Sequence, residues 1–341
     1  QGQSNTDPVD VLESGVISVE HNGLERSFPY RFHRPEDVPE AQKLPLVVFL
    51  HGAGERGEDN LRQIRHFPDR FVTEPHLSGH KSMLLAVQCP EREAWVKFSR
   101  EFDRRHESNE ITPSMAGVLA AIRKVVAQES VDTSRIYLTG LSMGGFGAWD
   151  LAARYPDWFA AVVPICGGGA PKLMAPRLID MPIWAFHGTA DRLVPEIQSG
   201  EMIDAIREAG GSPRYTRLEG VGHNAWRFAY GPEGAMDWMF AQKRDTPAVI
   251  PARKSPNIIV VMSDDQGYGD LSCHGNPVLE TPNLDELASR SCQMGAFYVQ
   301  PVCAPTRAAL MTGRVPQRTT AIDTWIARAM LATEETTIAE R

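Results

Sequence analysis

The sequence is poor in cysteine, in long apolar runs and in excess positive charge. Its five cysteines among 341 residues show no Cys-x-x-Cys spacing, which argues against a zinc site. No apolar run approaches the roughly 20 residues that span a bilayer, so we expect no membrane partner. With 35 Lys and Arg against 43 Asp and Glu, the formal net charge is −8. Acidity spread over the whole chain argues against a nucleic-acid partner, which would need a basic face.

What the chain does have is α/β patterning in two blocks, separated by a proline-rich stretch. Apolar content of 42% and charged content of 23% are typical of a globular protein. Residues 1–245, with a core over about 15–245, predict one α/β domain with a mostly parallel central sheet. Residues 246–256 carry three prolines and no helical or strand period, which predicts a linker. A second, partial α/β pattern occupies residues 257–341.

The most informative motif is Gly-x-Ser-x-Gly at residues 140–144, with its serine at Ser142. It directly follows the apolar run 135–139, which predicts a strand. A strand that runs into this motif and then into a helix is the nucleophile elbow of serine hydrolases, where glycines permit a tight, strained turn. We therefore predict that Ser142 is a nucleophile and that the backbone N–H of Met143 points at the developing oxyanion.

A base and an orienting acid follow in the chain order of an α/β-hydrolase. Asp191 comes after the apolar run 182–186, and His223 comes after the strand-like run 214–218. Both would lie at the carboxyl edge of a parallel sheet, where active sites form. His223 would take the serine proton and return it to the leaving group, while Asp191 would orient the imidazole. The plainer alternatives are a helix N-terminal acid and a structural loop histidine. His51 and His187 also end strands, but we expect them to shape turns or to donate supporting hydrogen bonds.

The second oxyanion donor should come from the loop after an earlier strand. The apolar run 46–50 predicts a strand buried on both faces, and it leads into residues 51–57. The backbone N–H of Ala53 or Gly54 is our candidate. This loop also matches G-x-G-x-x-G, but the next strand-like run, 83–87, ends without the acid that a dinucleotide site needs. We expect no nucleotide and no other cofactor for this domain.

Six motifs together resemble a known esterase branch. They are HGAGERG at 51–57, QCP at 88–90, GLSMGG at 140–145, PICGGG at 164–169, HGTAD at 187–191 and GHNAW at 222–226. Over about residues 15–245 the chain resembles the α/β-hydrolases near polyhydroxybutyrate depolymerases, feruloyl esterases and predicted peptidases. The resemblance implies serine-dependent hydrolysis of carboxylic esters through an acyl-enzyme, often on acetyl or feruloyl esters of polysaccharides. A serine peptidase of the same fold and a non-catalytic glycan-binding module are the alternatives.

Aromatic and charged residues near these motifs bear on the substrate. Trp226 follows His223 by three residues and Trp95 follows the QCP motif, so either could line an acyl or sugar pocket, or simply be a core or rim tryptophan. Glu55 and Arg56 could touch substrate, although a solvated loop pair is the simpler interpretation.

The second block resembles the N-terminal part of type I sulfatases. The apolar run 257–262 predicts a buried strand, and Asp264 and Asp265 follow it; Cys303 begins a Cys-x-Pro-x-Arg sequence that ends at Arg307. The resemblance implies that Cys303 becomes formylglycine, that Asp264 and Asp265 bind calcium, and that Arg307 supports the formylglycine. Residues 257–341 match only the start of such enzymes. We therefore expect no sulfatase activity and no calcium requirement unless the sulfatase part is complete.

Two further expectations concern environment. The chain begins at Gln1 with a polar run, which suits a mature N-terminus and a secreted or periplasmic protein. Cys89 and Cys166 each follow a predicted strand at the same sheet edge, so a disulfide between them is a possibility that the sequence leaves open.

Overall fold

The computed structural model describes residues 7–39, 41–97, 110–251, 259–295, 297–324 and 330–338. The chain divides into two compact units, Gln1–Pro256 and Asn257–Arg341. Each unit is described by itself.

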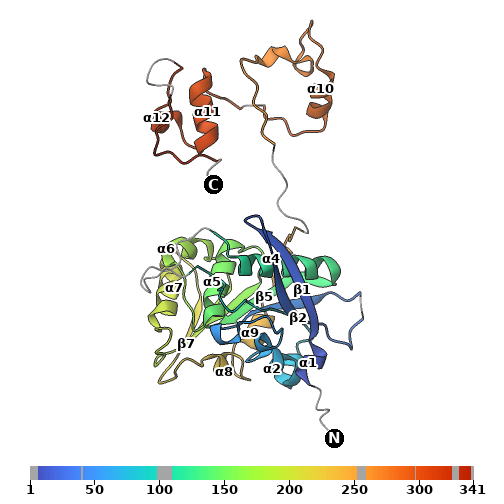
Figure 1. Ribbon diagram of the computed structural model, residues 1–341, viewed down its shortest axis with the longest axis vertical. Coiled ribbons are helices and arrows are strands. Elements are labelled where there is room, and N and C mark those ends of the chain that lie inside the picture. The colour runs from blue at the N-terminus through green and yellow to red at the C-terminus, as the bar shows by residue number, and fades with distance from the viewer. Residues whose placement is uncertain are drawn as a thin grey trace. The chain divides into compact units, whose positions relative to one another are not determined.

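The first unit is built on one eight-stranded sheet, in the order β1-β2-β4-β3-β5-β6-β7-β8 (Figure 1). β1 and β2 form an antiparallel hairpin, β2 also runs antiparallel to β4, and the remaining neighbours are parallel. The strands are β1 Glu13–His21, β2 Leu24–His33, β3 Leu44–Leu50, β4 Met83–Val87, β5 Val131–Leu141, β6 Ala161–Ile165, β7 Trp184–Gly188 and β8 Arg214–Leu218.

Helices cover both faces of this sheet, because the central strands are apolar on both sides. Leu46 and Val48 of β3 face one core cluster, whereas Val47 and Phe49 face the other. The first cluster lies under α4 Pro113–Gln128, α5 Met143–Arg154, α6 Pro171–Met174 and α7 Ile197–Glu208. The second lies under α2 Pro68–Thr73, α3 Pro75–Ser78, α8 Trp226–Ala229 and α9 Met236–Phe240, with α1 Pro8–Val11 beside α2. Short 3-10 turns at Ala53–Glu55, Arg62–Ile64 and Ala175–Arg177 complete the unit.

The strand order places a switch point between β3 and β5. From β3 the chain continues to β4 on one side, and from β5 it continues to β6 on the other. At such a point the loops that leave the two neighbouring strands diverge and open a crevice at their carboxyl ends, where ligands bind in open α/β sheets. The turns after β3 and β5 carry the 51–57 loop and Ser142, so the fold brings together two motifs about 90 residues apart.

The predicted linker is only partly free of the first unit. The backbone N–H of Ala248 donates to the carbonyl of Thr133, and Ile250 packs against the first core cluster. Residues 252–256 lie outside the described part. The described linker residues up to Ile250 therefore extend the first unit.

The second unit contains helices α10 Pro282–Ser289, α11 Cys303–Thr312 and α12 Pro316–Thr319, with 3-10 turns at Tyr268–Asp270 and Ser272–His274. Residues 257 and 258 of the strand predicted over 257–262 lie outside the described part. Residues 259–262 form no strand, and Ile259 and Val261 are 86% and 88% exposed. The predicted buried strand is thus wrong for these residues, because a parallel strand needs hydrogen-bonded neighbours and the described residues of this unit provide none.

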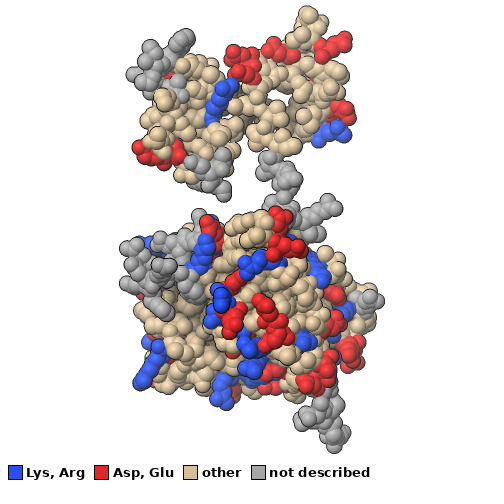
Figure 2. All heavy atoms as spheres, viewed as in Figure 1, with Lys and Arg blue, Asp and Glu red and all other residues tan. Residues whose placement is uncertain are grey.

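Two surface properties bear on function. On the face of the first unit drawn in Figure 2, acidic and basic side chains are interspersed. Among the described residues, no helix is both long and apolar enough to cross a membrane.

Candidate active site

Ser142 sits on the strained turn that the sequence predicts. β5 ends at Leu141 and α5 begins at Met143, and Ser142 between them has φ 54° and ψ −119°. Such a φ is costly for a residue with a side chain and persists only where the surroundings enforce it. Here α5 lies so close to the sheet that a Cβ on Gly144 would come 1.9 Å from the carbonyl oxygen of Leu50. Glycine at 144 is therefore what lets the helix approach and the serine project.

The structure brings Ser142, His223 and Asp191 into one hydrogen-bonded row. Nε2 of His223 lies 2.8 Å from Ser142 Oγ, and Nδ1 of His223 lies 2.6 Å from Asp191 Oδ2. Asp191 follows β7 and His223 follows β8, so both approach from neighbouring parallel strands at the same sheet edge as Ser142. The arrangement leaves one imidazole nitrogen for the serine hydroxyl and the other for the carboxylate, as a serine nucleophile requires.

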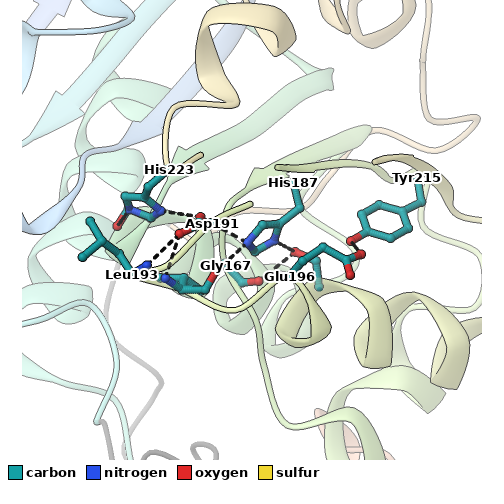
Figure 3. A network of polar contacts seen from close by, with 10 residues as sticks. Gly167, His187, Asp191, Leu193, Glu196, Tyr215 and His223 are labelled. Atoms are coloured by element: carbon teal, nitrogen blue, oxygen red, sulfur yellow. Dashed lines mark hydrogen bonds and ion pairs between the residues drawn. The ribbon is translucent and has the colours of Figure 1, made fainter. Parts of the chain in front are cut away.

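Asp191 is held as an anion by its surroundings. Its Oδ1 accepts the backbone N–H groups of Leu193 and Val194 at 2.9 and 3.0 Å, while its Oδ2 faces His223 (Figure 3). Burial by itself would raise the pKa of Asp191, but these hydrogen bonds outweigh it and the pKa lies below its usual value. The carboxylate can thus stabilise an imidazolium without taking its proton.

A second row of buried groups lies beside Asp191 and was not predicted to meet there. Nε2 of His187 is 3.0 Å from the Val194 carbonyl and 3.4 Å from Asp191 Oδ2. Nδ1 of His187 is 2.8 Å from Ser199 Oγ, which donates to the Gly167 carbonyl (Figure 3). His187 thereby ties the turn that carries Asp191 to α7, in keeping with the supporting role predicted for it. The only mark of this row in the sequence is that His187 and Asp191 both belong to the HGTAD motif.

The candidate oxyanion donors lie at two helix starts on neighbouring strands. Met143 is the first residue of α5, and Ala53 is the first residue of the 3-10 turn Ala53–Glu55 after β3. N–H groups in a first helical turn have no acceptor within their own helix, so they are available to an oxyanion. Because β3 and β5 are paired, the two helix starts share one edge of the sheet. Gly54 is the next residue of the same turn.

His51 shapes the loop that carries these donors. Its Nε2 accepts the backbone N–H of Cys89 at 2.9 Å, and its Nδ1 lies 2.6 Å from the Gly52 carbonyl. Burial lowers the pKa of His51 to about 4, so the ring is neutral. His51 thus links the turn after β3 to the end of β4.

The two tryptophans predicted near the substrate have different places. The ring of Trp226 lies 5.6 Å from that of His223 in an edge-to-face arrangement, so it borders the site. Trp95 is fully buried, its Nε1 donates to the His51 carbonyl at 2.9 Å, and its Cβ packs where a side chain on Gly147 would otherwise lie. The predicted pocket role of Trp95 is therefore wrong, and this side chain belongs to the core behind the loop 51–57.

Glu55 is not the solvated partner of Arg56. Its side chain is buried, and its Oε1 lies 3.4 Å from Nε2 of His66, while Nε of Arg56 donates to the Ala53 carbonyl. Burial would raise the pKa of Glu55, but the hydrogen bond from His66 and its charge hold it below the usual value. A carboxylate thus stands in the oxyanion loop, next to the candidate donors.

The sulfatase-like residues do not assemble into a metal site. Asp264, Asp265 and Cys303 are exposed, and Asp264 Oδ1 accepts from Arg307 at 3.1 Å. Among the described residues, the one set of three or more His, Cys, Asp or Glu ligand atoms within 4.8 Å of one another is Cys166, His187 and Asp191, beside the candidate triad. Within the described part of 257–341, no three such ligand atoms therefore come together.

The cysteines are all free thiols. Cys89 and Cys166 are buried, and no disulfide joins them. Burial raises the pKa of Cys89 to about 11 and that of Cys166 to about 12, so both stay protonated and inert.

A serine on a strand–helix elbow, followed by an acid and a histidine after later strands of a mostly parallel sheet, defines an α/β-hydrolase. Comparison with known proteins agrees. Residues 92–229 match the Dienelactone hydrolase family model, and residues 256–340 match the Sulfatase model. A solved thermostable esterase is 36% identical, with a TM-score of 0.61, over 69% of this chain and 64% of its own.

Two further similarities are lower in sequence identity or cover less of the chain. A solved ferulic acid esterase, 17% identical with a TM-score of 0.50, covers 67% of this chain and 98% of its own, and shows the fold alone. Arylsulfatase A of Homo sapiens is 49% identical over 72 residues, which are 21% of this chain and 14% of that protein. The chain thus spans about a seventh of the length of the sulfatases it matches. It contains an esterase-like α/β-hydrolase domain followed by a sulfatase segment.

Proposed function

We propose that the first unit is a serine carboxylic-ester hydrolase that works through an acyl-enzyme. The observation that carries the proposal is the row from Ser142 Oγ through the His223 ring to Asp191, with distances of 2.8 and 2.6 Å. The thermostable esterase, 36% identical over this part of the chain, supports an ester as the bond that is cleaved. None of the proposed steps uses a cofactor.

The proposed chemistry follows from the geometry. His223 removes the proton of Ser142 as the oxygen attacks the ester carbonyl, and Asp191 stabilises the resulting imidazolium. The oxyanion accepts hydrogen bonds from the N–H of Met143 and from that of Ala53 or Gly54. The intermediate collapses when His223 protonates the leaving alcohol. Water then attacks the acyl-enzyme by the same route, which releases the acid and restores Ser142.

The proposed substrates are short acyl or feruloyl and acetyl esters of polysaccharides. The solved ferulic acid esterase supports no more than the fold, so this choice rests on the sequence motifs and on an aromatic residue, Trp226, beside His223. A serine peptidase would use the same three residues, and the substrate tests separate the two.

The test compares Ser142→Ala with the unaltered chain on p-nitrophenyl esters of increasing length and on methyl ferulate. We expect turnover to fall by about three orders of magnitude or more. Ser78→Ala, which changes an exposed serine on α3, is the matched control and should keep full activity. Turnover that survives in Ser142→Ala would refute the assignment of Ser142 as the nucleophile. Cleavage of peptide amides in preference to esters would show that the unit is a peptidase and not an esterase.

A further inference from the structure

The buried carboxylate of Glu55 has no role in the chemistry described so far. Glu55 is buried, although Ala53 and Gly54, the residues before it, are exposed. Burying a carboxylate is costly unless hydrogen bonds compensate for the lost water. Two groups do so here: the backbone N–H of Gly52, and Nε2 of His66, which lies 3.4 Å from Oε1. These contacts join the loop 51–57 to the turn that carries His66.

The contact with Gly52 closes the loop on itself. Gly52 is the N-cap of the 3-10 turn Ala53–Glu55, so Glu55 is the third residue of that turn. The N–H of Glu55 donates to the Gly52 carbonyl at 3.4 Å, while the Glu55 carboxylate accepts the Gly52 N–H. A glutamate at this third position that reaches back to the N-cap N–H is one half of the capping box, which fixes a helical first turn. The turn fixed in this way contains the candidate oxyanion donors Ala53 and Gly54.

The same carboxylate stands beside the nucleophile. A Cβ on Gly52 would lie 2.9 Å from Oε2 of Glu55 and 3.5 Å from Cβ of Ser142. The Glu55 and Ser142 side chains therefore border one small space, which glycine at 52 leaves open. Ser142 Oγ already has His223 as its base, at 2.8 Å. The chemistry thus asks for no second base, and the carboxylate is left to act on the loop that it caps.

His66, the other partner of the carboxylate, is held in a strained conformation. Its φ is 73°, a left-handed value that a residue with a side chain keeps only where the surroundings enforce it, and such residues gather at functional sites. The next residue, Phe67, is fully buried in the second core cluster and anchors the turn. The His66 ring lies 5.3 Å from the Trp226 ring, which lies 5.6 Å from that of His223. The imidazole is thus presented to Glu55 from a fixed place next to the base of the triad.

We propose that Glu55 is a positioning residue for the oxyanion hole. Its carboxylate, anchored on His66, holds the N–H of Gly52 and keeps the turn at Ala53 and Gly54 in the conformation that binds the oxyanion. Donors that are already in place need no reorganisation at the moment of reaction. A loosened turn would therefore slow the chemical step without weakening substrate binding. The proposal rests on the proposed ester hydrolysis and adds to it a residue outside the triad.

The test measures kcat and KM for p-nitrophenyl acetate in Glu55→Ala, Glu55→Gln and Glu58→Ala. Glu55→Ala should lower kcat about 10- to 100-fold with KM unchanged, somewhat less than the loss of a whole oxyanion donor costs. Glu55→Gln keeps an oxygen for the Gly52 N–H and an NH2 group for the ring of His66, so it should retain most of kcat. Glu58→Ala is the matched control, the same change at an exposed glutamate three residues on, and should keep full activity.

A trifluoromethyl ketone inhibitor separates positioning from a general loss of structure. Ser142 Oγ adds to its carbonyl carbon as His223 takes the serine proton, and the former carbonyl oxygen becomes the oxyanion. In Glu55→Ala the Ki of this inhibitor should rise by the same factor by which kcat/KM falls, since both report binding of the oxyanion. A change in overall folding would not tie the two factors together.

His66→Asn tests the anchor, because asparagine tolerates the left-handed backbone but lacks the imidazole. It should lower kcat about tenfold, and the double variant with Glu55→Ala should lose no more than Glu55→Ala alone, since the two residues act as a unit.

Unchanged kcat in Glu55→Ala overturns the proposal, as does a loss in Glu55→Gln equal to that in Glu55→Ala. If Glu55→Ala does not fold, full activity of His66→Asn overturns it instead. In each case ester hydrolysis stands as long as the unaltered chain cleaves p-nitrophenyl acetate through Ser142. Absence of that cleavage would refute the proposed function itself.

Discussion

Lowering the pH should destabilise the hydrolase unit through one residue in particular, His51. Its ring is fully buried between two fixed backbone groups. Nε2 must be unprotonated to accept the Cys89 N–H, and the single proton on Nδ1 is donated to the Gly52 carbonyl. A second proton would break the bond to Cys89 and place a charge away from water. For that reason the pKa of His51 falls from 6.5 to about 4.

The sign and size of the effect follow from linkage. In the unfolded chain His51 takes up a proton near its ordinary pKa, whereas in the folded chain it does so only near pH 4. Between these values the unfolded state binds more protons, so stability is complete above pH 6.5 and decreases as the pH falls. Because the pKa of His51 is lowered by about 2.5 units, the free energy of unfolding falls by about 2 kcal/mol between neutral pH and pH 5. By pH 4 the loss reaches about 3 kcal/mol.

The assay is urea unfolding at pH 7.5 and at pH 5, followed by tryptophan fluorescence. Six of the seven tryptophans lie in residues 1–256, so the signal reports on the hydrolase unit. The comparison is with His51→Gln, which cannot titrate and whose amide oxygen can accept the Cys89 N–H. His33 and His187, whose pKa values burial also lowers, titrate in both proteins and cancel. Between the two pH values the unaltered chain should lose about 2 kcal/mol more than the variant. Equal losses would refute the assignment to His51.

Three further predictions test the packing around the site. Tyr230→Phe removes a fully buried hydroxyl that lies 2.8 Å from Thr139 Oγ1. It should lower the free energy of unfolding in the urea assay by about 1 kcal/mol. An unchanged value would mean that hydrogen bonds to water in the unfolded chain are worth as much as this one. Gly144→Ala places a methyl group 1.9 Å from the backbone carbonyl oxygen of Leu50. It should lower the free energy of unfolding, measured by thermal unfolding, by about 1–3 kcal/mol, and should slow ester turnover because the turn at Ser142 shifts. Unchanged stability would show that α5 can move away from the sheet freely. Ellman's reagent should titrate the three exposed cysteines in the native chain and all five in urea, because Cys89 and Cys166 are buried and free; a native count of five would show that these two are accessible.

The candidate triad was predictable because its signals are local. A glycine-bracketed serine after an apolar run predicts a tight turn after a strand, and parallel strands bring all their carboxyl ends to one edge. The predicted strands at 83–87 and 214–218 coincide with β4 and β8. The antiparallel hairpin of β1 and β2 was not predicted, since its strands face solvent in part and lack a continuous apolar run.

The environment of each side chain was not predictable in the same way, because burial depends on residues distant in the chain. Trp95 is core because Gly147 leaves room for it and the His51 carbonyl accepts its N–H. Glu55 is buried, and the partner of its carboxylate is His66, which lies beyond the following turn. Neither partner is marked by any spacing in the sequence.

Two apolar runs of similar composition show most directly what a sequence pattern leaves undetermined. Residues 46–50 and 257–262 would both be taken for strands buried on two faces. The first is a strand because β4 and β5 bond to it on either side and helices cover both faces. In the described part of the second, residues 259–262 have neither kind of neighbour and stay exposed. An apolar run of this kind indicates only that its side chains favour burial. Whether it becomes a strand is decided by the other strands that the chain supplies, so residues 259–262 should become a strand only alongside partner strands.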